Sequence, residues 1–91
     1  MARPLKPELD VYDALANPLR RRIVERLRKG DMAATELVDE FGITQPALSR
    51  HLQVMRRARL VQQRSAGQRR IYRLNTAALK PALRWIGRQV E

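Results

Sequence analysis

The chain has 91 residues, no cysteine, and 19 lysines and arginines against nine aspartates and glutamates, giving a formal net charge of +10. This length suits one domain, and the lack of cysteine excludes disulfides and thiolate metal sites. No run of apolar residues is longer than three, which argues against a membrane span or a secretory segment. We therefore expect a cytoplasmic protein whose partner is a polyanion, with nucleic acid ahead of an anionic membrane surface.

The N-terminal segment is expected to be a flexible arm over residues 1–8, because it contains two prolines and no periodicity. One domain should follow over residues 9–91. Its first element is predicted as a short helix over residues 9–16, in which Leu9 and Tyr12 share one face.

The next segment predicts a second helix. Asn17 is a favoured capping residue, and Pro18 suits the first helical position. An apolar stripe at helical spacing then runs until Gly30, and it consists of Leu19, Ile23, Val24 and Leu27. The arginines between these positions are expected to form a solvated face rather than a binding site: Arg20, Arg21, Arg22, Arg26 and Arg28.

A third helix is expected over residues 35–41, followed directly by Gly42 and Ile43. Glycine supplies the left-handed backbone that ends a helix sharply. Thr44 can cap the next helix, and Pro46 is tolerated in its first turn. A helix, a tight glycine turn and a second helix at this spacing predict a helix-turn-helix.

The helix predicted over residues 45–58 has two different faces. On a helical wheel, Leu48, Leu52 and Met55 share an apolar face, and His51 lies at its edge. The opposite face carries polar groups that can reach base edges or phosphates in a major groove. No residue from 45 to 61 is acidic, which favours DNA contact over plain solvation. The predicted DNA-binding residues of this element are Thr44, Gln45, Pro46, Ser49, Arg50, Gln53 and Arg57.

Two strands are predicted over residues 60–64 and 70–74, joined by a turn over residues 65–69 with Gly67 at its tip. A hairpin that follows a helix-turn-helix forms a wing. Its polar side chains are expected to contact phosphates beside a groove, and they are Arg64, Gln68, Arg69 and Arg70. A basic hairpin that is merely solvated is the alternative.

The last helix should open at Asn75-Thr76, and Pro81 should start its regular part or kink it. Its apolar stripe can cap the domain's own core or pair with the first helix of a second copy. A chain this short buries a modest core, so we favour a homodimer. The predicted dimerisation residues are Leu9, Tyr12, Leu79, Leu83, Trp85, Ile86 and Val90.

These elements predict a mainly α fold with a small β-hairpin. The order is two helices, a short strand, two helices, two strands and a helix, which is a winged helix-turn-helix. From about residue 15 to residue 74 the chain closely resembles the ArsR-type winged helix-turn-helix repressors. The most specific parts are residues 14–23 (ALANPLRRRI), 45–52 (QPALSRHL) and 56–61 (RRARLV).

The resemblance implies a symmetric dimer, built from the first and last helices, that binds an imperfect palindrome near a promoter and blocks transcription. Such a protein is associated with the bacterial nucleoid and can repress its own gene. Matched position by position, Gln45, Ser49 and Arg50 correspond to the contact positions of the recognition helix. Arg69 and Arg70 correspond to the wing, and His51 to a histidine that packs within the helix.

One departure from the family concerns its sensor sites. Many members sense a metal through a Cys-x-Cys pair before the turn, or through Asp and His on the last helix. Here residues 36–39 are Glu-Leu-Val-Asp, and the last helix has no His, Asp or Glu before Glu91. Zinc needs about four ligands, so neither a metal nor another cofactor is expected, and any small-molecule effector is unknown.

Other functions remain as alternatives. The main one is a protein-interaction module with a winged-helix fold that does not bind DNA specifically. RNA binding is disfavoured because an exposed aromatic platform is lacking. An enzyme is not expected, since no nucleophile has a neighbouring base and no glycine-rich phosphate loop occurs. A pocket at the dimer interface, lined by Tyr12 and Trp85, can hold a small apolar effector, although core packing explains these rings better.

Overall fold

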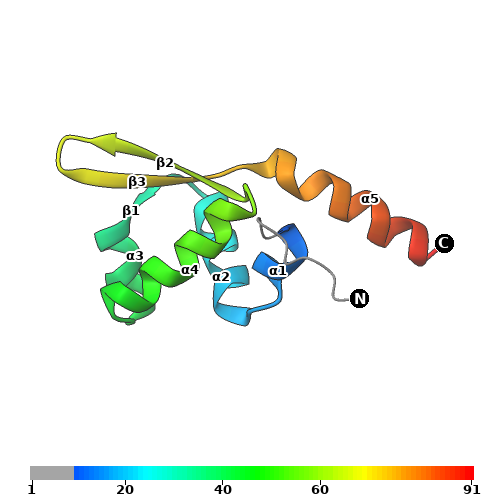
Figure 1. The fold of residues 1–91 in the computed structure, drawn as a ribbon, viewed down its shortest axis with the longest axis horizontal. Coiled ribbons are helices and arrows are strands. Elements are labelled where there is room, and N and C mark those ends of the chain that lie inside the picture. Colours follow the sequence, from blue (N-terminus) through cyan, green and yellow to red (C-terminus); the bar gives the residue numbers. More distant parts are fainter. Residues whose placement is uncertain (1–9) are drawn as a thin grey trace, which may run out of the picture.

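The computed structural model describes residues 10–91. The predicted arm over residues 1–8 and the predicted dimer residue Leu9 lie outside the described residues. Within residues 10–91 the chain forms five α-helices and a three-stranded antiparallel sheet (Figure 1). The elements are α1 (Val11–Leu15), α2 (Pro18–Arg28), β1 (Met32–Ala33), α3 (Ala34–Phe41), α4 (Gln45–Arg57), β2 (Val61–Ala66), β3 (Arg69–Leu74), the 3₁₀ turn η1 (Thr76–Leu79) and α5 (Lys80–Gln89).

The first two helices begin at side-chain caps. At α1, Asp10 and Asp13 each accept a hydrogen bond from the other's backbone N–H, at 3.0 and 2.9 Å. This capping box starts the helix later than predicted, at Val11. At α2, Asn17 Oδ1 accepts from the backbone N–H of Leu19 at 2.8 Å, as the sequence predicts.

The helix-turn-helix is formed by α3 and α4. Gly42 has the left-handed backbone that the sequence predicts, with φ of 62°, and its N–H donates to Val38 O at 2.9 Å. Thr44 Oγ1 then accepts from the N–H of Ala47 at 3.3 Å and caps α4. A left-handed residue lets the chain end one helix and start the next within a few residues.

The sheet has the order β1-β3-β2, so β2 is an edge strand. Val61 pairs with Leu74 and Ala66 pairs with Arg69, which leaves a turn of only Gly67 and Gln68. The predicted turn, with Gly67 at its tip, is confirmed in place but is shorter than residues 65–69, because a two-residue turn beginning at a left-handed glycine closes the hairpin.

The core lies between α2, α3, α4 and the sheet. Its largest fully buried side chains are Ile23, Leu37, Leu48, Leu52, Met55 and Leu60. By contrast, α5 extends away from this body (Figure 1), and Pro81 lies in its first turn as predicted. None of the helices in the described part of the chain has the length and apolarity needed to cross a membrane.

Candidate nucleic-acid interface

Helix α4 has one buried and one exposed face, as the helical wheel predicts. Leu48, Leu52 and Met55 are at most 2% exposed and belong to the core. The predicted contact residues on this helix are all exposed: Gln45, Pro46, Ser49, Arg50, Gln53 and Arg57, together with the capping residue Thr44. Because the fixed cap and turn hold the front of α4, these side chains project from a rigid element into solvent.

The N-terminal end of α4 lies beside the wing. Gln45 lines a hollow of about 200 Å³ together with Gln68, Arg69 and Arg70 of the hairpin. The rest of its wall comes from the start of α3, at Ala33, Ala34 and Thr35. The structure thus brings predicted contact residues from two distant parts of the sequence to one place.

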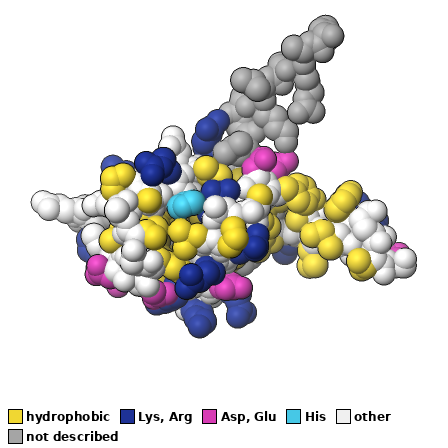
Figure 2. Space-filling model, turned by 90° about the horizontal axis from the view of Figure 1, so that it is seen from below, with side chains coloured by type: hydrophobic (Ala, Val, Ile, Leu, Met, Phe, Trp, Pro, Cys, Tyr) yellow, Lys and Arg dark blue, Asp and Glu magenta, His cyan; other side chains and the backbone are white. Residues whose placement is uncertain are grey.

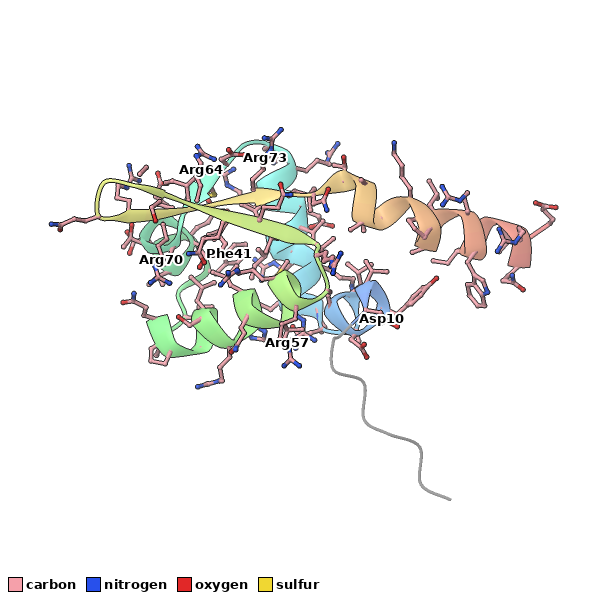
Figure 3. All side chains as sticks on the ribbon, turned by 45° about the horizontal axis from the view of Figure 1, so that its top comes forward. Asp10, Phe41, Arg57, Arg64, Arg70 and Arg73 are labelled. Carbon is pink, nitrogen blue, oxygen red and sulfur yellow. The ribbon has the colours of Figure 1, made fainter. Side chains whose placement is uncertain are left out.

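The wing arginines do not all lie on the same side of the hairpin. Cross-strand partners share a face, and successive residues alternate between faces. Arg70 pairs with Ser65, whereas Arg64 pairs with Ile71, so Arg64 and Arg70 lie on opposite faces (Figure 3). Arg69 pairs with Ala66, so the same rule puts it on the face of Arg64, although at the end of the hairpin it also lines the hollow beside Gln45. Arg64 Nη1 donates to Asp31 Oδ2 at 2.8 Å, and its predicted contact with DNA stays a prediction.

Arg69 is oriented by a carboxylate. Its Nη2 lies 3.2 Å from Glu36 Oε1, and the same oxygen accepts from the N–H of Ala33 at 2.8 Å. Glu36 therefore joins the start of α3 to the wing. Both side chains of the ion pair are more than half exposed, so the pair contributes little stability in water and leaves Arg69 accessible.

His51 lies at the edge of the apolar face of α4 and is half-buried. Arg20 Nη1 lies 3.1 Å from His51 Nδ1, and since a guanidinium can only donate, Nδ1 accepts and the neutral ring carries its proton on Nε2. Arg20 also donates to Ala14 O at 2.8 Å and Asp13 O at 3.0 Å. The arginine ties α1 to α4, so the prediction that it belongs to a solvated face is wrong. Figure 2 shows the histidine in cyan between apolar and basic side chains.

This contact makes stability depend on pH. Burial, followed by the charges of Arg20 and Arg50, lowers the pKa of His51 below its usual 6.5. The unfolded chain therefore takes up the proton more readily, and stability present above about pH 6.5 is lost as the pH falls. Thermal melts between about pH 7.5 and about pH 5 will show a smaller loss for His51→Gln, whose amide oxygen accepts from Arg20 but does not titrate. An equal loss in both proteins would contradict this role.

A groove of about 690 Å³ runs between the end of α4 and the edge strand β2. Its polar lining is Gln53, Arg56, Arg57, Arg59, Gln62, Gln63 and Asn75. Gln53 and Arg57 were expected at the interface, but the others were not. The turn that leads from α4 into β2 contains Arg59, whose φ of 61° is rare for a residue with a side chain. The carbonyl of Arg59 accepts a hydrogen bond from Asn75 Nδ2 at 2.8 Å. No local sequence signal predicts that turn.

The exposed large apolar side chains gather at α1 and α5. Tyr12 is 45% exposed, Leu83 71%, Trp85 50%, Ile86 50% and Val90 80%, and Leu79 is half-buried. Figure 2 shows this apolar surface along the arm formed by α5. The start of the predicted stripe, at Leu79, packs against the domain's own core, but the rest of the stripe does not cover it. The rings of Tyr12 and Trp85 meet edge to face with centroids 6.2 Å apart, so within one chain they pack against each other.

Known proteins are similar to this chain in both sequence and fold. The family described as bacterial regulatory protein, arsR family, matches residues 17–63. The transcriptional repressor SdpR of Bacillus subtilis is 34% identical, with 85% of this chain and 86% of SdpR covered. The HTH-type transcriptional regulator Rv2034 of Mycobacterium tuberculosis is 47% identical over 75% of this chain, which spans 64% of that protein.

The fold comparison agrees with the sequence comparison. The crystal structure of a possible transcriptional regulator for arsenical resistance has a TM-score of 0.76 and 34% identity, covering 86% of this chain and 84% of that one. The matched region includes α2, α3, α4 and the first residues of β2, which are the elements that build and present the exposed face of α4. The chain therefore belongs to the arsR family of bacterial regulatory proteins.

Proposed function

We propose that the chain is a homodimeric transcriptional repressor that binds a palindromic operator through α4 and the end of the wing that carries Arg69 and Arg70. The observation that carries this proposal is the exposed polar face of α4, whose front residue Gln45 shares a hollow with Gln68, Arg69 and Arg70. Glutamine, serine and arginine at the front of a helix can donate to base edges, and the wing arginines suit phosphates. Such a repressor works on the bacterial nucleoid in the cytoplasm.

The apolar surface of α1 and α5 supports the dimer. Large apolar side chains exposed together on a small domain mark an interaction surface. When the same surface of two copies packs together around a two-fold axis, the result is a closed dimer. Two copies of α4 would then enter successive major grooves about 34 Å apart. If the dimer engages about eight phosphates, log K will fall with log salt at a slope near −7.

The test is selection of binding sites from random or genomic duplexes by the purified protein, followed by sequencing. The expected product is a palindrome whose half-sites are centred about 10–11 base pairs apart. Protection of the DNA upstream of the protein's own gene in a footprinting experiment would indicate that the protein also represses that gene. Enrichment of no sequence, with equal binding to every duplex, would overturn the proposal of a specific operator.

The wing makes a separate prediction. Arg70→Ala will weaken binding to operator and scrambled duplexes about equally, because a phosphate contact carries no sequence information. Loss of one contact from each protomer will reduce the salt slope by about 2. The matched control is Arg64→Ala. Because Arg64 lies on the other face of the hairpin from Arg70, we now expect, unlike the prediction from sequence, that it does not contact the duplex held by α4, so this variant will leave affinity for a short operator duplex unchanged. An equal loss in both variants would contradict this assignment of faces.

A second candidate function is a protein-interaction module, which the exposed apolar side chains of α5 favour. In that case the apolar surface binds a different protein, and DNA binding is unspecific. Sedimentation of the purified chain separates the two functions. A dimer that binds operator supports the repressor, whereas a monomer that enriches no DNA sequence supports the module.

A further inference from the structure

The outer face of the sheet, the side turned away from α4 and Arg70, carries its own group of cations. Arg73 pairs with Gln62, and Arg64 pairs with Ile71, so these residues share that face. Figure 3 shows Arg64 and Arg73 above the hairpin and Arg70 below it. Ile71 is only 9% exposed and stands outside the main core cluster, and it lines one hollow together with Arg64 and Arg73.

Three observations join these cations into one surface. Arg64 and Arg73 line the same hollow of about 460 Å³ with Gln62 and Gln63. Arg73 also lines a hollow of about 210 Å³ that includes Arg28 and Lys29 at the end of α2. Asp31 in the loop after α2 receives the hydrogen bond from Arg64 at 2.8 Å. The surface therefore continues from the wing, across β3, to the end of α2.

The charge of this surface identifies the chemistry of its partner. Arg28, Lys29, Arg64 and Arg73 are all exposed, and among the described residues Asp31 is the one acidic residue lining either hollow. Protein interfaces have apolar cores with aromatic anchors, whereas the exposed large apolar side chains among residues 10–91 belong to α1, to α5 and to Val90 directly after it. Arginine, lysine and glutamine side chains on an exposed sheet face can donate hydrogen bonds to a sugar-phosphate backbone.

We propose that the outer face of the sheet, around Arg64 and Arg73, binds the backbone of a second DNA duplex, without regard to sequence, while α4 and the end of the wing hold the first. This inference rests on the proposed function, because it assigns the first duplex to α4. A straight duplex against α4 and Arg70 lies on the inner side of the hairpin, so it leaves Arg64 and Arg73 uncovered. A dimer bound at its operator then joins two segments of DNA.

The experiment uses operator duplex fixed to beads, saturated with the full chain and washed. A fluorescent duplex lacking the operator is added, and its retention is measured across a salt series. The wild-type complex will retain the second duplex and release it as salt rises. Arg64→Ala/Arg73→Ala will reduce retention about tenfold and reduce its salt slope by about 2, because two phosphate contacts are lost. Its affinity for the first duplex will change by less than about twofold.

The matched control is Arg84→Ala/Arg88→Ala, which removes the same charge from exposed positions on α5 and will retain the second duplex as the wild type does. Failure to bind the first duplex would overturn the proposed function. Normal binding of the first duplex without retention of the second would overturn only this inference. Equal retention by Arg64→Ala/Arg73→Ala and the wild type would overturn it too. So would displacement of the second duplex by polyglutamate at equal charge, because the surface would then take an acidic protein segment.

Discussion

Replacing Ile86 with glutamate will turn the dimer into a monomer and lower its affinity for a two-half-site operator by at least about 100-fold. Ile86 is half exposed and lies on α5 with the exposed Leu83 and Trp85, and exposed Val90 follows the helix directly. In a two-fold interface each substitution occurs twice, so two carboxylates would be buried among apolar side chains without partners. Once the subunits separate, the second half-site no longer binds as an intramolecular event.

Sedimentation equilibrium and fluorescence anisotropy measure the two consequences of Ile86→Glu separately. The control is Thr76→Glu, which adds the same charge at an exposed position of η1 and will stay dimeric with full affinity. Because α5 stands off the core, Ile86→Glu will melt as a folded domain, which circular dichroism checks. Its affinity for a single half-site will remain near that of the wild type. A dimeric Ile86→Glu protein, or a monomer with full operator affinity, would refute the role given to this surface.

The helix-turn-helix was predictable because its signals are local. Asn17, Gly42 and Thr44 each act through hydrogen bonds or backbone angles within a few residues, and the apolar stripe of α4 needs only its own spacing. The exposed face of α4 follows directly from that stripe. These parts of the fold and the site could therefore be predicted residue by residue.

The wing was less predictable because a strand's faces depend on register. A shift of one residue moves every side chain to the other face, and a turn over residues 65–69 leaves that register open. The two-residue turn at Gly67 and Gln68 fixes it and separates Arg64 from Arg70. The contact between Arg20 and His51 joins residues 31 positions apart, and no local pattern encodes such a pair.

Replacing Arg50 with alanine will cost about 1–3 kcal/mol per half-site and relax specificity at one base pair in each. Arg50 is exposed on the front half of α4, and it makes no ion pair within the part of the chain that the structure describes. Its guanidinium is therefore available to donate two parallel hydrogen bonds to guanine, the commonest specific contact in a major groove. Losing these two parallel hydrogen bonds removes base recognition as well as charge.

Arg50→Lys separates the two contributions, because lysine keeps the charge but lacks the planar guanidinium that donates two parallel hydrogen bonds. Affinities of wild type, Arg50→Ala and Arg50→Lys are measured on the operator, on operators changed at each base pair, and on a scrambled duplex. Both variants will lose discrimination at the same base pair, and Arg50→Lys will keep most of its affinity for the scrambled duplex. Equal losses on operator and scrambled DNA would leave Arg50 as a phosphate contact, and base reading would then have to come from Gln45 and Ser49.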